Sequence, residues 1–157
     1  MERHFSRTAS ARMSSSARWL GYAGLIPQIL LAAVVIGGPV KVGPPAVGLA
    51  LSYSALILSF IGGAWWGLAA NQKMRVPLWL WLAAIAPALI AFAAIGALAI
   101  GSLVRPGLLV IGVSLIAALG VDGKLAANGF CPPGWLRLRT PLSLGLGGLT
   151  ILIAISP

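Results

Sequence analysis

The sequence predicts an all-α, polytopic membrane protein, built as a five-helix transmembrane bundle with the N-terminus inside and the C-terminus outside. Three observations support this fold class. Of 157 residues, 59% are hydrophobic and 8% are charged, whereas roughly a quarter of an ordinary soluble domain is charged. The apolar residues form runs long enough to cross a bilayer, and most basic residues lie in alternate gaps between these runs. The length suits one domain.

Each predicted element follows from the apolar runs. A helix that crosses the hydrocarbon core needs about 20 apolar residues, with a range of about 17–25. We expect spans at residues 19–37, 47–70, 77–100, 106–121 and 141–156. The last two spans are short, so each helix would include flanking residues or cross a thinner bilayer. Together they form one transmembrane domain over residues 18–157, which follows a flexible basic tail over residues 1–17.

The distribution of basic residues predicts the orientation. Lys and Arg are enriched in cytoplasmic loops. Only Lys41 and Arg105 lie in the first and third gaps, while nine basic residues lie in the tail and in the second and fourth gaps. These nine, expected inside, are Arg3, Arg7, Arg12, Arg18, Lys73, Arg75, Lys124, Arg137 and Arg139.

The composition of the tail indicates in which membrane the protein resides. It is rich in Arg and Ser and has one acid, Glu2, features that it shares with mitochondrial transit peptides. A basic tail on a bacterial protein has the same composition. We therefore expect a multi-pass protein of the bacterial inner (cytoplasmic) membrane, with the mitochondrial inner membrane as the alternative.

Prolines mark the starts and the bends of the predicted helices. Pro27 and Pro87 lie within spans, where each removes a backbone hydrogen bond and should kink the helix. The carbonyls that they free, those of Ala23 and Ala83, need protein or water partners inside a bilayer. Other prolines open spans at the first turn, where the missing N–H costs nothing; they are Pro77, Pro106 and Pro141.

The second span, which contains "LSFIGGAWWGLAAN", combines the smallest and the largest side chains. On a helical wheel its small, weakly polar wedge contains Gly48, Ser52, Ala55, Ser59, Gly62, Gly63 and Trp66. Pointing away from this wedge are Ile57, Ile61, Ala64, Trp65 and Leu68. Gly63 and Gly67 also form a GxxxG pair, and small residues let helices approach closely in lipid. We expect the small face to pack against a neighbouring helix, with Trp66 at its end; alternatively, it lines a ligand cavity.

Asp122 is the only acidic residue after Glu2, and it follows the fourth predicted span at the inner interface. An ionisable residue at a membrane edge is a candidate functional group. The alternative is an ion pair with Lys124, Arg137 or Arg139 that anchors the inner loop. Trp135 and the two arginines could also contact anionic lipid head groups.

The sequence lacks the usual signatures of enzymes and metal sites. It has no paired carboxylates, no Ser/His/Asp set and no Gly-rich phosphate loop. Because His4 and Cys131 are the only residues of their kinds, neither a disulfide within the chain nor a His/Cys metal site is expected. We predict no enzymatic activity and no cofactor. Cys131 is expected to be structural or incidental, and the scattered basic residues argue against nucleic-acid binding.

The chain contains three segments that are similar to segments of a known family. They are "WLGYAGLIPQIL", "YSALILSFIGGAWWGLA" and "GWLRLRTPLSL". From Trp19 onward the chain resembles the uncharacterised membrane family that includes mitochondrial transmembrane protein 69 and proteobacterial relatives. The resemblance implies a small inner-membrane protein without an assigned reaction. Gln28 departs from the pattern, which has an apolar or aromatic residue there. The matching positions are Gly24, Pro27, Ser59, Phe60, Gly62, Gly63, Trp66, Gly67, Trp135, Leu138, Arg139, Leu142 and Ser143.

These observations predict a non-enzymatic accessory, assembly or scaffold protein. Its expected partners are membrane lipids and either another membrane protein or further copies of the chain. The alternative is a small pore or carrier for a neutral or lipid-like molecule, built from Gln28, the two proline kinks and the Gly/Ser face. A lipid-modifying enzyme is a third interpretation.

Overall fold

The computed structural model describes residues 15–39, 43–72 and 75–156, and this part of the chain is helical and contains no strand. Five helical segments within it are long and apolar enough to cross a membrane, so the chain is a multi-pass membrane protein. The first of these segments is formed by α1 and α2 together. The elements are α1 (Ser15–Ala23), α2 (Ile26–Gly37), α3 (Gly43–Ala70), α4 (Leu78–Gly96), η1 (Ala97–Ala99), η2 (Gly101–Leu103), α5 (Val104–Ala127) and α6 (Trp135–Ile155).

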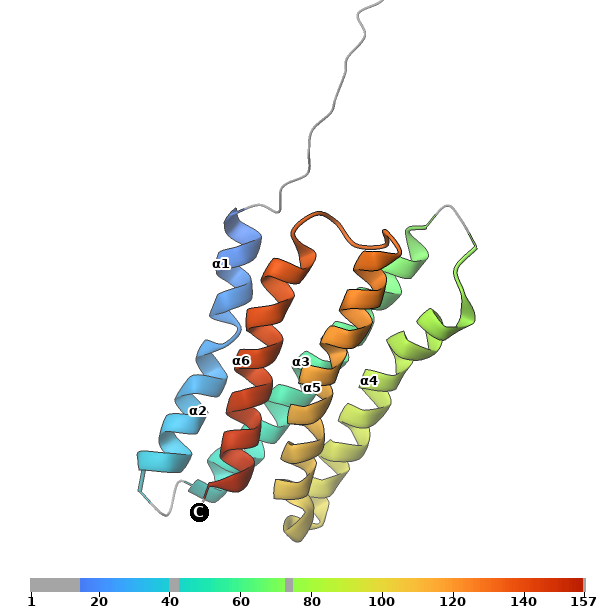
Figure 1. The fold of residues 1–157 in the computed structure, drawn as a ribbon. Helices are drawn as coiled ribbons and strands as arrows, with labels where there is room; N and C mark the ends of the chain where they lie inside the picture. Colours follow the sequence, from blue (N-terminus) through green and yellow to red (C-terminus); the bar gives the residue numbers. More distant parts are fainter. Residues whose placement is uncertain (1–14, 40–42, 73–74, 157) are drawn as a thin grey trace, which may run out of the picture.

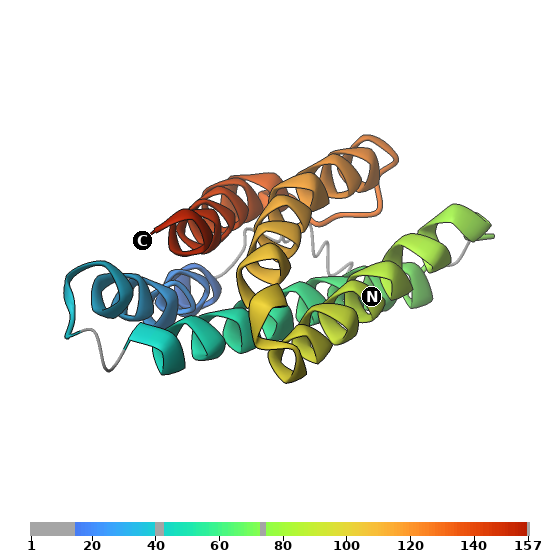
Figure 2. The same ribbon diagram turned by 90° about the horizontal axis from the view of Figure 1, so that it is seen from below.

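The helices run up and down in one bundle (Figure 1). α5 packs along α6 and α3 packs along α4, while α1 and α2 lie beside α6 (Figure 2). α3 contacts α2, α4, α5 and α6, which makes it the central helix. The start of α1, the end of α3 and the α5–α6 connection lie at one end of the bundle (Figure 1). We call this the α5–α6 loop end.

Buried leucine and isoleucine side chains fill the core, and glycines bring two helices into close contact. Leu51, Leu108 and Leu115 are fully buried. A Cβ atom on Gly112 would lie 3.0 Å from the Gly147 carbonyl oxygen, and a Cβ atom on Gly147 would lie 2.8 Å from the Gly112 carbonyl oxygen. α5 and α6 can therefore approach this closely only because both positions lack a side chain, as expected for helices in lipid.

The last two spans are longer than the sequence predicted. α5 continues past residue 121 to Ala127, and α6 begins at Trp135 rather than at 141. Pro141 consequently lies inside α6 and does not open it, so that prediction is wrong. The apolar runs stop at charged side chains, but a helix continues through such residues when they have partners or lie at its end.

The two prolines predicted to kink their helices, Pro27 and Pro87, act differently. The chain leaves the helix between α1 and α2, and Pro27 lies in the first turn of α2, so the predicted kink is a complete break. The Tyr53 hydroxyl, on α3, donates a hydrogen bond to the Gly24 carbonyl at this break. A protein partner is therefore supplied for a carbonyl in the apolar interior, as a bilayer requires. α4 continues through Pro87, which is buried.

The buried face of α3 differs from the predicted small face. Ile61 and Trp65, expected to point away, are each 2% exposed. Gly63 and Gly67 face outward, and a Cβ atom built on either would meet no described atom within 4 Å beyond its chain neighbours and the backbone of its own helix. The predicted contact of this GxxxG pair with a helix of the same chain is wrong. Gly62 does make a close contact, with α4, where its Cβ would lie 2.4 Å from the Ala84 carbonyl oxygen.

Candidate functional site

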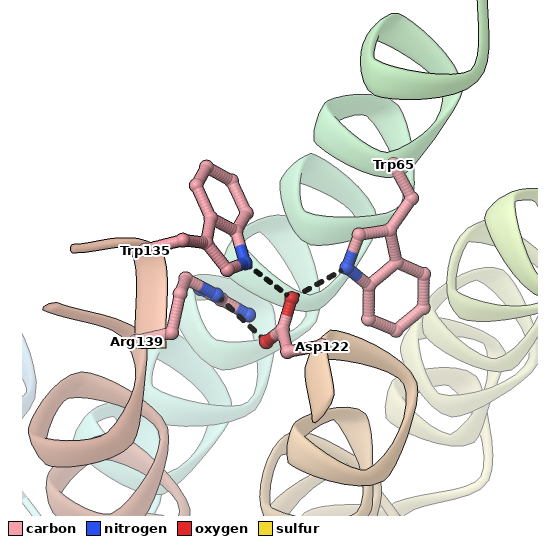
Figure 3. A network of polar contacts seen from close by, with 4 residues as sticks. All are labelled: Trp65, Asp122, Trp135 and Arg139. Atoms are coloured by element: carbon pink, nitrogen blue, oxygen red, sulfur yellow. Dashed lines mark hydrogen bonds and ion pairs between the residues drawn. The ribbon is translucent and has the colours of Figure 1, made fainter. Parts of the chain in front are cut away.

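Asp122 is the centre of a polar network that joins three helices near the α5–α6 loop end (Figure 3). Its side chain is fully buried. Trp65 Nε1, from α3, and Trp135 Nε1, from α6, each donate to Oδ1 at 2.8 Å. Arg139 Nε, also from α6, donates to Oδ2 at 3.0 Å. Both carboxylate oxygens therefore have protein donors.

The network compensates for the burial of a charge. An ionised carboxylate is costly to bury unless it is both paired and hydrogen-bonded. Arg139 supplies the opposite charge, and its side chain is only 12% exposed. Its guanidinium carbon lies 5.9 Å from the centre of the Trp135 ring, within reach of a cation–π attraction. The ion pair expected for Asp122 is thus formed with Arg139, although Asp122 lies inside α5 and not after the span.

Trp65 belongs to this network, and the sequence analysis did not place it there. The helical wheel sorted α3 by side-chain size, which placed Trp65 on the outer face. A second signal was available: Leu58, Ile61, Trp65 and Ala69 recur at helical spacing, and all four are buried. Bulky residues that recur at this spacing can also mark a buried face.

The other residues singled out in the second span do not converge on Asp122. Phe60 is 72% exposed, and Gly63 and Gly67 also face outward. Ser59 is half-buried. Trp66 is 47% exposed and packs edge-on against Trp81 of α4, with ring centres 4.8 Å apart, so it does lie against a neighbouring helix. Gly62 is the member of the motif that is buried between α3 and α4.

A second polar contact joins α2 to α6. Gln28 is fully buried, and its Nε2 donates to Thr150 Oγ1 at 3.0 Å. Thr150 in turn donates to the Leu146 carbonyl at 2.7 Å. Arg105, at the other end of the bundle, donates to the carbonyls of Ala154 and Ser156 near the end of α6. These contacts fix the position of α6 against its neighbours.

Cys131 lies in the connection between α5 and α6 and is half-buried. Burial and the nearby Asp122 carboxylate, opposed by Arg139, raise the pKa of its thiol to about 11. Because the thiolate is the reactive form, this thiol is a weak nucleophile at neutral pH. Among residues 15–39, 43–72 and 75–156, no three His, Cys, Asp or Glu side chains gather as metal ligands.

Comparisons with known proteins place the chain in a family. Searches of the curated proteins and of the solved structures gave no significant match. A family model described as "Protein of unknown function (DUF3429)" matches residues 13–155. The match includes all five spans and the four residues of the Asp122 network. The chain therefore belongs to this family of proteins of unknown function.

Proposed function

We propose that this chain is a non-enzymatic accessory, assembly or scaffold protein of a bacterial inner membrane, with the mitochondrial inner membrane as the alternative location. The observation that carries the proposal is the state of Asp122. Both of its oxygens are occupied by donors from α3 and α6, so this carboxylate joins helices and is not open to a substrate. The location rests on the resemblance to the family of mitochondrial transmembrane protein 69 and its proteobacterial relatives.

The pore or carrier alternative was based on residues that lie in different parts of the bundle. It required Gln28, the proline kinks and the Gly/Ser face of α3 to surround one path. Gln28 is bonded to Thr150 between α2 and α6, whereas Gly63 and Gly67 face out of the bundle. These groups therefore do not line a common cavity, and the accessory role is the better supported one.

The orientation follows from charge at the two ends of the bundle. Arg105 is in the first turn of α5 and contacts the end of α6, which places it at the end of the bundle opposite the α5–α6 loop end (Figure 1). The described basic residues near the α5–α6 loop end are Arg18, Arg75, Lys124, Arg137 and Arg139. By the positive-inside rule, the α5–α6 loop end faces the cytoplasm.

The orientation is tested by labelling a cysteine with a charged, membrane-impermeant thiosulfonate. Cys131 should react in inverted vesicles and not in intact spheroplasts. Its rate should rise about tenfold per pH unit up to about pH 9, because the thiolate fraction grows as pH approaches a raised pKa. For rapid labelling of the same loop, Asn128→Cys is placed in a Cys131→Ala chain. Ile100→Cys in that chain should show the opposite sidedness, and labelling of Asn128→Cys only in spheroplasts would reverse the orientation.

The accessory role is tested through the outward face of α3. Phe60, Gly63 and Gly67 lie on this face, where small residues allow a close approach by another helix. Gly63→Leu should leave the melting temperature unchanged, since the position is open. The same substitution should sharply reduce the recovery of a stoichiometric membrane-protein partner, or of a second tagged copy, after gentle detergent extraction.

Gly148→Leu is the matched control. Gly148 lies on α6 and is exposed. Like Gly63, it has no described atom within 4 Å of an added Cβ atom beyond its chain neighbours and the backbone of its own helix. It should retain both stability and association. Equal recovery from Gly63→Leu, Gly148→Leu and unmodified chains would contradict the use of this α3 face, and a chain that purifies alone in every mild detergent would contradict the accessory role.

A further inference from the structure

A pocket of about 190 Å³ lies beside the break between α1 and α2, and α3, α5 and α6 complete its walls. Its deep wall includes Ile61, Leu115 and Leu146, which are buried. Its rim includes Leu20 and Phe60, which are 74% and 72% exposed. Because these rim side chains face the surroundings of a transmembrane bundle, the pocket communicates sideways with the lipid.

Two polar side chains of α6 line this otherwise apolar pocket. Arg139 and Ser143 are one helical turn apart. Within the described part of the chain, Arg139 Nη2 and Ser143 Oγ are buried atoms without a hydrogen-bond partner. Buried polar atoms normally have partners, so two unpartnered groups at one pocket call for an explanation.

The chemistry of these two groups indicates what would bind them. A guanidinium N–H is only a donor, and a hydroxyl can donate. A ligand group that meets both must therefore be an acceptor. The Nε of Arg139 already pairs with Asp122, which neutralises most of the positive charge, so an uncharged carbonyl oxygen and a carboxylate oxygen are both suitable.

The rest of the pocket lining favours a ligand whose acceptor group is attached to an apolar chain. Leucine, isoleucine and phenylalanine side chains form most of the lining. A volume of about 190 Å³ is similar to that of an engineered apolar cavity of about 150 Å³ that binds benzene. This space suits a short stretch of acyl chain next to its carbonyl group, with the rest of the chain extending past Leu20 and Phe60 into the bilayer.

We propose that this pocket binds the carbonyl end of an acyl lipid, with Arg139 Nη2 and Ser143 Oγ donating to the carbonyl or carboxylate oxygen. The ligand enters between α1 and α3 from the bilayer. The pocket shares Phe60, at its rim, with the outward α3 face used in the accessory proposal, but Gly63 and Gly67 do not line it, and the proposal does not depend on a protein partner.

The test uses the full chain in detergent with palmitate that carries a photoreactive diazirine near its carboxyl group. After irradiation, the crosslink should map to α6 around Ser143 or to α3 around Ile57 and Ile61. Ser143→Ala should weaken binding about five- to tenfold, the value expected for one lost hydrogen bond. It should not lower the melting temperature, because the hydroxyl has no partner in the protein.

Ser54→Ala is the matched control. Ser54 is also buried, but its hydroxyl bonds to backbone carbonyls of its own helix, and it does not line the pocket. It should leave palmitate labelling unchanged. Competition by unlabelled palmitate alone would identify a free fatty acid as the ligand, whereas equal competition by methyl palmitate would identify a lipid ester carbonyl. Labelling spread over outward faces such as that around Phe92, and equal in Ser143→Ala and unmodified chains, would overturn the proposal.

Discussion

Replacing Asp122 with alanine is expected to lower the free energy of unfolding by about 3–5 kcal/mol, the usual cost of removing one member of a buried ion pair. The substitution leaves the largely buried Arg139 guanidinium without its carboxylate and the indole N–H groups of Trp65 and Trp135 without their acceptor. Thermal or denaturant unfolding in detergent, followed by tryptophan fluorescence, measures the loss.

Two further variants distinguish this anchoring role from a functional one. Asp122→Asn keeps the shape, but its amide can place only one oxygen among three donors, so it should also unfold more easily. Adding Arg139→Ala to Asp122→Ala should recover part of the loss, because the isolated charge is then removed. The exchange Asp122→Arg with Arg139→Asp should recover little, since the arginine would meet two indole donors. A chain with Asp122→Asn that melts like the unmodified one would argue against anchoring.

Arg137→Ala is the matched control for this series. Arg137 lies on the same helix, two positions before Arg139, but it is exposed. Exposed charges contribute little to stability, so its loss should leave the melting temperature nearly unchanged. A loss of stability as large as that of Asp122→Ala would mean that the net charge of the loop end, and not the buried pair, determines stability.

Leucine at Gly62 should destabilise the bundle, whereas leucine at the adjacent Gly63 should not. A Cβ atom at Gly62 would lie 2.4 Å from the Ala84 carbonyl oxygen and 3.2 Å from Pro87 Cβ. α3 and α4 must then separate, at a cost of about 1–3 kcal/mol or more. At Gly63 a Cβ atom would meet no described atom within 4 Å beyond its chain neighbours and the backbone of its own helix, and unfolding in detergent compares the two variants directly. Equal melting temperatures would mean that α3 presents a different face to α4.

Much of this architecture can be predicted from the composition and from the lengths of the apolar runs, without knowledge of the structure. The thickness of the hydrocarbon core sets how many apolar residues a helix needs, and this constraint acts on each segment separately. Spans around residues 19–37 and 47–70 are therefore predictable from local sequence. A kink at Pro27 is predictable too, because proline has no N–H to donate to the preceding turn, but the complete break between α1 and α2 is not, since α4 continues through Pro87.

Only the tertiary structure decided which faces meet and which residues form the site. Hydropathy cannot orient a helix such as α3, because both of its faces are apolar and lipid accepts either one. Packing shape placed Gly62 against α4, and the need for hydrogen bonds in the interior turned Trp65 inward toward Asp122. The helix ends at Ala127 and Trp135 also lay beyond the predicted spans, since a helix continues through a charged residue that has partners from other helices, as Asp122 has, or that is exposed near the end of the bundle, as Lys124 is.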